Sequence, residues 1–496
     1  MFDGFYSNIT KAPDFPAGFD WINSKEPLSL EKLRGHVVVL DFWTYCCINC
    51  MHTLPVLAEL EEKFSDMPVV FIGIHSAKFS NEQDRRNIEH AVRRYEISHP
   101  VLVDRNMTVW QRYDVSGWPT IVIIDPRGTV VYKQSGEGQK EMVEDTIEVL
   151  LEKHAKNNTL SPEPLKISMK PSKDVSILSF PGKLSISEDM IAISDSNHNR
   201  VLVTDMSGKI MHTIGMGRRG FCDGNFKTAM FFRPQGIVWK DGMLYVADTE
   251  NHAVRKVDIS TQTVSTVAGT GKQGPWMSPG GKGPETSLSS PWDVAVKDNL
   301  VFIAMAGNHQ LWVLDTDTGL VSPFAGSGHE DIVDGSRTRA RLAQPSGLSV
   351  HDDRAFFADS ETSSIRYVDL SSGMVNTLAG HGLFVFGHKD GPLSESLFQH
   401  PMGLCALHGR ILVADTYNSA IREIALEMGT ASTLIGNQGM PGICKVGQGG
   451  CDSLGLYEPG DVKAYKEKLY IADTNNHLIR IYDQKTNILK TLGIRP

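Results

Sequence analysis

The segment Asp41-Phe-Trp-Thr-Tyr-Cys-Cys-Ile-Asn-Cys50 places three cysteines directly after the apolar run Val37-Val-Val-Leu40. A short apolar run of this kind is typical of a buried strand. From about 47 to 64 the apolar residues recur on one face at helical spacing, which predicts a helix. The stretch therefore predicts a strand-to-helix junction in an α/β sheet, and such junctions are where these sheets bind and react with ligands.

Cys47 and Cys50 are separated by two residues at the predicted start of this helix. Two cysteines with that spacing lie close enough to form a small disulfide ring, and the helix N-terminus stabilises the thiolate of the first one. We expect Cys47 to be the attacking thiol and Cys50 to be the buried, resolving thiol.

Three other interpretations of these cysteines are a structural zinc site, a peroxidase cysteine and an inert cluster. A structural zinc site needs four ligands, and the chain contains no second Cys-x-x-Cys and no His-x-x-x-His pair. A peroxidase cysteine of the peroxiredoxin type would need a proline where Leu40 stands, although Thr44 fits that pattern. A buried, inert cysteine cluster remains open.

More distant residues extend the pattern, and the segment resembles thioredoxins. Asp41 lies six residues before Cys47, where that family keeps a buried carboxylate as proton acceptor for the resolving cysteine. Pro55 lies five residues after Cys50, where the family helix is kinked. Trp118-Pro119-Thr120 matches the cis-proline loop, which in the family packs against the disulfide and pairs with the substrate backbone.

The sequence also departs from thioredoxins beside the cysteines. Cys46 replaces the usual aromatic residue, and Ile48-Asn49 replaces Gly-Pro, so the redox potential and the direction of the reaction stay open. Cys46 has three possible roles: a vicinal disulfide with Cys47, an extra resolving thiol, or a small residue that fills a gap beside Trp43.

His75 ends a second predicted strand that starts at Pro68, so it has a place at the carboxyl edge of the sheet. It either tunes the cysteines or hydrogen-bonds the loop that follows it. The α/β domain is predicted to span residues 1–154. Its further predicted elements are a helix at 81–95, strands at 100–104 and 129–134, and a helix at 139–154. The polar, proline-bearing stretch 155–164 predicts a linker whose short reach favours docking of the two domains.

Residues 165–496 contain six copies of a repeat in which a short apolar strand ends in Ala-Asp or a close variant. The repeat aspartates and the methionine that replaces one of them are Asp195, Asp248, Met305, Asp359, Asp415 and Asp473. A second marker keeps the same phase, because prolines 181, 234, 291, 345, 401 and 459 each precede the first strand of a repeat. Each repeat has room for four short strands, which predicts an all-β propeller with six blades.

Asn476-His-Leu478 and related strings resemble NHL repeats, so we expect a six-bladed NHL propeller. We expect the repeat aspartates to accept backbone amide hydrogen bonds and fix turns. The arginines seven residues after four of them, Arg255, Arg366, Arg422 and Arg480, should support the blades. His252, His309 and His477 recur at equivalent positions and suggest a metal site, but they fall in separate blades, so we expect turns and no metal or other cofactor.

Taken together, the two domains resemble the NHL repeat-containing protein 2 family over nearly the whole chain. The shared details include the Cys46-Cys-Ile-Asn-Cys50 string, the loop Ser76-Ala-Lys-Phe79 and Ala304-Met-Ala-Gly307. The animal members carry an additional C-terminal β domain that we do not expect here. The substrate of the family is obscure, so the resemblance implies architecture more than activity.

Charge and composition bear on location and partners. The first 164 residues carry 17 basic and 24 acidic side chains, and the remainder carries 32 and 34, so the propeller offers no basic field for nucleic acid despite Arg337, Arg339 and Arg341. The sequence has no run of eighteen apolar residues, so we expect no membrane span. The N-terminus lacks the basic and apolar regions of a secretory signal. We expect a cytosolic protein whose partners are proteins, and in a reducing compartment Cys444 and Cys451 should not pair.

The leading functional hypothesis is a thiol-disulfide oxidoreductase domain joined to a propeller that recognises a protein partner or substrate. Cys47 attacks, Cys50 resolves, Asp41 accepts a proton and Pro119 supports the substrate strand; Cys46, His75 and Trp118 are accessory candidates. The alternative is a non-catalytic interaction scaffold or redox sensor in which the cysteines are structural.

Overall fold

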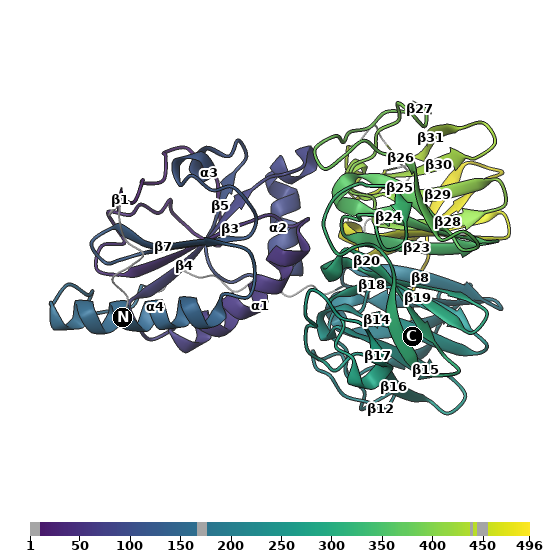
Figure 1. Ribbon diagram of the computed structural model, residues 1–496, viewed down its shortest axis with the longest axis horizontal. Coiled ribbons are helices and arrows are strands. Elements are labelled where there is room, and N and C mark those ends of the chain that lie inside the picture. The colour runs from purple at the N-terminus through teal and green to yellow at the C-terminus, as the bar shows by residue number, and fades with distance from the viewer. Residues whose placement is uncertain (1–9, 166–175, 437–439, 444–454) are drawn as a thin grey trace. The chain divides into compact units, whose positions relative to one another are not determined.

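The computed structural model describes residues 10–165, 176–436, 440–443 and 455–496, so Cys444 and Cys451 lie outside the described residues. The chain divides into two units, residues 1–173 and 174–496. The first is a mixed sheet with helices, and the second is a ring of six antiparallel sheets (Figure 1). No helix in the described ranges is long and apolar enough to cross a membrane.

The sheet of the first unit has seven strands in the order β1-β7-β6-β3-β4-β5-β2. Strands β3, β4 and β5 are parallel, β6 runs antiparallel to β3, and β7 runs antiparallel to β6. The predicted strands and helices are present, and the two-residue edge strands and α3 were not predicted. The elements are β1 Thr10–Lys11, β2 Trp21–Ile22, β3 Val37–Trp43, α1 Ile48–Lys63, β4 Val69–Ser76, α2 Arg85–Arg94, β5 Val101–Asp104, α3 Thr108–Arg112, β6 Thr120–Ile124, β7 Thr129–Ser135 and α4 Lys140–Lys156.

Alternation along β3 decides which of its side chains face the helices α1 and α4. Val37 and Val39 pack with α1 and α4 on one face of the sheet, whereas Val38, Leu40 and Phe42 pack on the other. Asp41 continues the first set, because successive side chains of a strand point to opposite faces. A carboxylate is thus placed in the apolar layer beneath α1.

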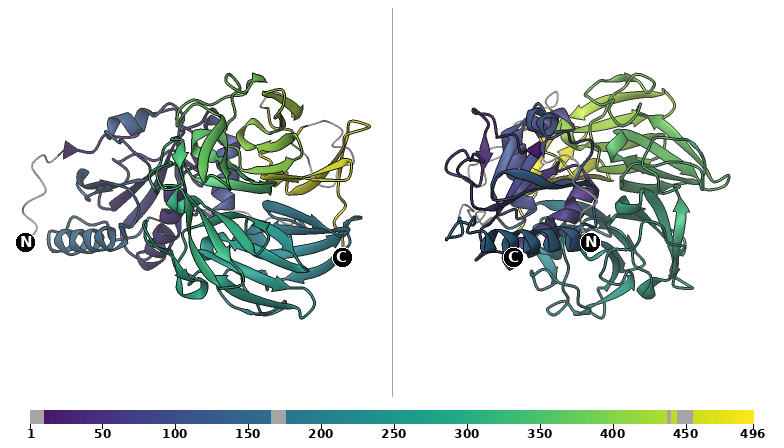
Figure 2. Two further views of the ribbon diagram at one scale, coloured as in Figure 1. Left: turned by 45° about the vertical axis from the view of Figure 1, so that its right-hand side comes forward. Right: turned by 60° about the vertical axis from the view of Figure 1, so that its left-hand side comes forward.

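The second unit contains six sheets, which confirms the six predicted blades. The innermost strand of each blade contacts that of the next, and the last contacts the first, which closes the ring. The yellow strands of blade six lie beside the blue-teal strands of blade one (Figure 2). The strands of the blades are β8 Pro181–Ser187, β9 Met190–Asp195, β10 Arg200–Asp205 and β11 Ile210–Ile214; β12 Gly224–Asn225, β13 Ile237–Lys240, β14 Met243–Asp248, β15 Ala253–Asp258 and β16 Thr263–Ala268; β17 Gly281–Lys282, β18 Pro291–Lys297, β19 Leu300–Met305, β20 Gln310–Asp315 and β21 Leu320–Ala325; β22 Gly335–Ser336, β23 Pro345–His351, β24 Arg354–Asp359, β25 Ser364–Asp369 and β26 Met374–Ala379; β27 Gly391–Pro392, β28 Gly403–Leu407, β29 Arg410–Asp415, β30 Ala420–Ala425 and β31 Thr430–Ile435; β32 Asp461–Tyr465, β33 Lys468–Asp473, β34 Leu478–Asp483 and β35 Ile488–Thr491.

The repeat aspartates accept backbone hydrogen bonds, as expected, but from a loop that precedes the blade. Oδ1 of Asp248 accepts the N–H of Phe232 at 2.7 Å, and Oδ1 of Asp415 accepts that of Gln399 at 2.8 Å, sixteen residues upstream in each case. Oδ2 of Asp248 pairs with Arg255 at 2.7 Å, and both side chains are fully buried. Each pair ties the loop that enters a blade to two strands of that blade.

Charged residues also meet where the innermost strands converge. Lys183 of the first blade lies 3.1 Å from a carboxylate oxygen of Asp293 in the third, and its Nζ also donates to the carbonyl of Met402 in the fifth. Lys183 and Asp293 are buried. A Cβ at Gly236, the equivalent residue of the second blade, would lie 2.4 Å from Cα of Asp293, so glycine is needed there. The ring is closed at its axis by an ion pair across three blades.

Candidate active site

The three clustered cysteines lie where β3 ends and α1 begins. Cys47 is the N-cap residue of α1 and is partly exposed, whereas Cys46 and Cys50 are buried. All three are free thiols. Burial raises the pKa of Cys50 well above its usual range, and its hydrogen bond with Cys47 and the charges of Cys47 and Asp41 raise it further. The geometry therefore separates one accessible sulfur from one buried sulfur that holds its proton.

The predicted proline loop lies against the accessible thiol. The peptide bond between Trp118 and Pro119 is cis. The Cys47 thiol donates to the carbonyl oxygen of Trp118 at 4.0 Å, and the Trp118 indole donates to the carbonyl of Ser76 at 3.0 Å. The structure thus brings Cys47, Trp118 and Pro119 together, although their sequence separation is about seventy residues.

Asp41 lies in the buried layer and is 3% exposed. Burial raises the pKa of its carboxyl to about 7, with His99 lowering it and Glu61 raising it. Neither oxygen has a hydrogen-bond partner among the described residues. A carboxyl group in this condition can take up and release a proton near neutral pH.

His75 and Cys46 are both fully buried. The ring of His75 stacks on Tyr45 and meets Trp43 edge-on, with ring centroids 5.5 and 5.0 Å apart. Neither ring nitrogen has a hydrogen-bond partner in the described ranges, so the expected bond to the following loop is not formed. Burial lowers the pKa of His75 to about 3. The Cys46 side chain is fully buried, and its sulfur lies 3.9 Å from the hydroxyl oxygen of Thr44.

Sequence reasoning missed three polar residues that support the site. Glu82 is fully buried, and its carboxylate accepts the backbone N–H groups of Cys46, Lys78 and Phe79 at 2.9–3.0 Å. The half-buried Glu61 and the buried His99 form an ion pair in the layer of Asp41. The sequence Ser76–Phe79 is shared with the family and forms part of the loop that Glu82 holds. No spacing rule, however, links Glu82, Glu61 or His99 to the cysteines.

The three repeat histidines do not converge on a metal. His252, His309 and His477 each have left-handed backbone at the end of a short turn, and the Nδ1 atom of each accepts a backbone N–H of an adjoining blade at 2.9–3.0 Å. In the described ranges, the one group of side chains spaced for a metal ion is the half-buried His351 at the end of β23 with the exposed Asp352 and His408.

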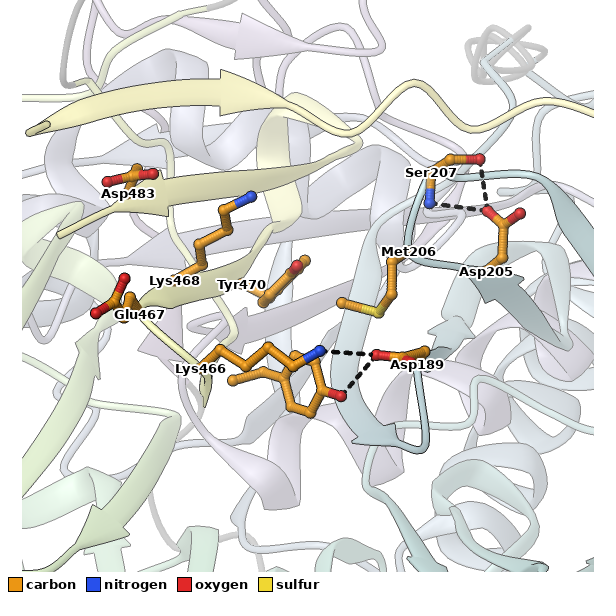
Figure 3. A pocket seen from close by; sticks show the side chains of 10 residues that line it. Asp189, Asp205, Met206, Ser207, Lys466, Glu467, Lys468, Tyr470 and Asp483 are labelled. Carbon is orange, nitrogen blue, oxygen red and sulfur yellow. Dashed lines mark hydrogen bonds and ion pairs between the residues drawn. The ribbon is translucent and has the colours of Figure 1, made fainter. Parts of the chain in front are cut away.

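A pocket of about 620 Å³ lies in the propeller where the first and last blades meet (Figure 3). Lys466 and Tyr465 reach across this junction to the carboxylate of Asp189, at 3.1 and 2.7 Å. Met206 and Tyr470 contribute apolar surface to its lining. The pocket belongs to the closure of the ring and has no counterpart among the predicted sites.

Comparison with known proteins agrees with both units. The sequence model of a thioredoxin-like family matches residues 35–130, and that of the NHL repeat matches residues 288–314. Thiol-disulfide oxidoreductase ResA of Halalkalibacterium halodurans is 27% identical over 125 residues, which are 25% of this chain and 68% of that protein. The N-terminal unit is therefore related to thiol-disulfide oxidoreductases.

Several relatives match both units at once, and two of them illustrate the match. Protein SUPPRESSOR OF QUENCHING 1, chloroplastic, of Arabidopsis thaliana is 43% identical over 497 residues, which cover 96% of this chain but 47% of that protein. NHL repeat-containing protein 2 of Gallus gallus is 41% identical over 520 residues, which cover 97% of this chain and 71% of that protein. The chain thus spans less than half of its plant relative, and it belongs to the family of NHL repeat-containing protein 2, in which a thioredoxin-like domain accompanies an NHL propeller.

Proposed function

We propose that the N-terminal unit is a thiol-disulfide oxidoreductase that acts on protein or peptide disulfides. One observation carries this proposal: the partly exposed Cys47 at the start of α1 faces the cis-proline loop, while Cys50 and Asp41 lie buried behind it. An inert cysteine cluster needs neither an accessible sulfur nor a titratable carboxyl group beneath it.

The proposed reaction has two thiol exchange steps. The Cys47 thiolate attacks one sulfur of a substrate disulfide, the substrate S–S bond breaks, and the leaving thiolate takes a proton from water. Cys50 then gives its proton to Asp41 and attacks the Cys47 sulfur; the bond between Cys47 and the substrate breaks, and the second substrate sulfur leaves as a thiolate that takes a proton from water. The substrate gains two electrons, the enzyme becomes the Cys47–Cys50 disulfide, and a dithiol reductant must regenerate it.

The loop at Trp118 and Pro119 is the proposed platform for the substrate backbone. Pro119 is buried, and its carbonyl accepts the N–H of Gly136 at 2.8 Å, which fixes this segment against β7. A fixed loop beside Cys47 can orient an extended peptide so that its sulfur approaches the thiolate.

The propeller is the proposed recognition element for a protein partner or substrate, because its charge is nearly balanced and suits no nucleic acid. The cytosol is the proposed compartment, since its reducing poise would return the oxidised pair to thiols. The plant relative is named as chloroplastic. Fractionation of the native host cell would test this assignment.

The decisive test is the identity of the disulfide formed under mild oxidation. Peptide mapping should find Cys47 joined to Cys50, and Cys50→Ser should accumulate a mixed disulfide between Cys47 and a peptide substrate. Cys46→Ser is the matched control and should keep both results. If Cys46 pairs with Cys47, or no disulfide forms within cellular redox potentials, the scaffold alternative replaces the oxidoreductase proposal.

A further inference from the structure

Four buried polar atoms on or near the proposed proton acceptor have no hydrogen-bond partner among the described residues. They are both carboxylate oxygens of Asp41, Nε1 of Trp43 and Nε2 of His99. Asp41 pairs in register with Gly73 on the adjacent strand β4. A Cβ at Gly73 would lie 2.9 Å from Nε1 of Trp43 and 3.1 Å from Nε2 of His99. The glycine therefore leaves the space in which both nitrogens approach the backbone next to Asp41.

The His99 ring is held in this orientation by a carboxylate of α1. Its Nδ1 donates to Oε1 of Glu61 at 2.5 Å, and the hydroxyl of Ser98 donates to Oε2 of Glu61 at 2.8 Å. The His99 side chain is 5% exposed and that of Glu61 is 18% exposed. Since Glu61 occupies Nδ1, the other nitrogen of the ring is the one that faces Gly73.

We propose that His99, held in place by Glu61, is the buried counter-charge of Asp41 and positions the proton that Asp41 takes from Cys50. The inference rests on the proposed oxidoreductase activity and deepens it. In this step the S–H bond of Cys50 breaks and an O–H bond forms on Asp41, with no change in oxidation state. His99 and Glu61 are positioning residues, because they act through Asp41.

The charges in this layer support that assignment. Cys50 and Glu61 face Asp41 from α1, His75 comes from β4, and His99 precedes β5. Burial alone would lower the pKa of His99, but the charge and hydrogen bond of Glu61, with the charge of Asp41, raise it. His75 stays neutral because burial lowers its pKa to about 3. Among these groups His99 is therefore the one whose surroundings favour a positive charge.

The first test is His99→Gln, measured by single-turnover kinetics across a range of pH. Loss of the imidazolium disfavours the ionised form of Asp41, so its pKa rises and the pH profile of the resolving step moves to higher pH. At pH 7 the step should slow about tenfold or more, as expected when a general base is mispositioned. His99→Lys restores a positive charge and should return the profile toward that of the parent.

A buried histidine elsewhere in the same unit supplies the matched control. His154 is buried on α4, and its Nδ1 lies 2.7 Å from the hydroxyl of Thr159. His154→Gln removes a buried imidazole without touching the layer of Asp41, so the pH profile should not move. An equal shift in both variants would overturn the proposal, because it would reflect general loosening of the unit.

A double-mutant cycle and a reciprocal titration complete the test. If His99 acts through Asp41, His99→Gln should have less than a twofold effect in the Asp41→Asn background. In Asp41→Asn alone, the pKa of the His99 ring, followed by NMR, should fall because its anionic neighbour is gone. This titration gives a result even if His99→Gln does not fold.

The outcomes separate the two proposals. A parent protein that forms no Cys47–Cys50 disulfide refutes the oxidoreductase activity itself. A disulfide that forms and turns over, with an unmoved pH profile in His99→Gln or an unmoved His99 titration in Asp41→Asn, refutes only the counter-charge.

Discussion

Asp41 is the residue whose chemistry depends most on where the chain places it. The apolar run before it makes β3 a buried strand, and alternation then fixes its carboxylate beneath α1 rather than in solvent. The same burial that makes it a candidate base also penalises its charge. The position thus gives up stability of the folded state for proton uptake near neutral pH, which is a common feature of functional sites.

We predict that Asp41→Asn stabilises the N-terminal unit above pH 7. The folded carboxyl has a pKa of about 7 against 3.8 in an exposed setting, so the folded state loses stability as pH rises from about 4 through 7. At pH 8 the amide variant should gain up to about 4 kcal/mol, and below pH 4 this gain should disappear. Calorimetric melting at both pH values measures the difference, and the exposed Asp66→Asn is its control. Equal melting of parent and Asp41→Asn at pH 8 would show that the carboxyl is not buried as a charge.

At the scale of the element, blade three shows that a propeller blade has more than one way to close. Where four other blades have an aspartate and an arginine seven residues later, this blade has Met305 and Trp312. The Met305 sulfur accepts the N–H of Ser289 at 3.3 Å, sixteen residues upstream, as the aspartates accept theirs. Trp312 is buried and donates to Gln310 at 2.9 Å. An apolar pair can therefore replace a buried ion pair while the loop contact is kept, in line with the modest net value of such pairs.

The blade comparison yields a prediction for Arg255. In Arg255→Met the Asp248 carboxylate stays buried without its cation, which should cost about 3 to 5 kcal/mol. The double variant Asp248→Met with Arg255→Trp imitates blade three and should cost less than the single change. Urea unfolding of the propeller measures both, with Lys256→Met on the same strand as control. A double variant less stable than Arg255→Met would mean that blade three owes its stability to other contacts.

At the scale of the whole molecule, the sequence predicts what is local or periodic. The six-fold phase of prolines and aspartates predicted the ring, and the spacing of Cys47, Cys50 and Pro119 predicted the elements that meet at the site. The pairs of His99 with Glu61 and of Lys183 with Asp293 were not predicted, because each joins charges from distant elements by distances that only the fold sets. The residues two positions after the six repeat prolines are Lys, Gly, Asp, Gly, Gly and Asp. Only the closed ring shows that the lysine and the first of these aspartates meet.

The axial ion pair gives a further prediction. Lys183→Met leaves Asp293 buried without its lysine, so the propeller should lose about 3 to 5 kcal/mol of unfolding free energy. Adding Asp293→Asn removes the stranded charge and should recover part of that loss. Urea unfolding checks both variants, and a Lys183→Met protein as stable as the parent would show that the pair is dispensable.

The same buried pair has a consequence for the axis of the propeller. Side chains of blades one and three meet where Lys183 contacts Asp293, and both residues are buried, so a charged contact occupies the place where the innermost strands converge. An ion or small molecule that moved along the axis would have to displace this contact. Separation of the pair would therefore couple the two faces of the propeller, because the strands that carry Lys183 and Asp293 run between them.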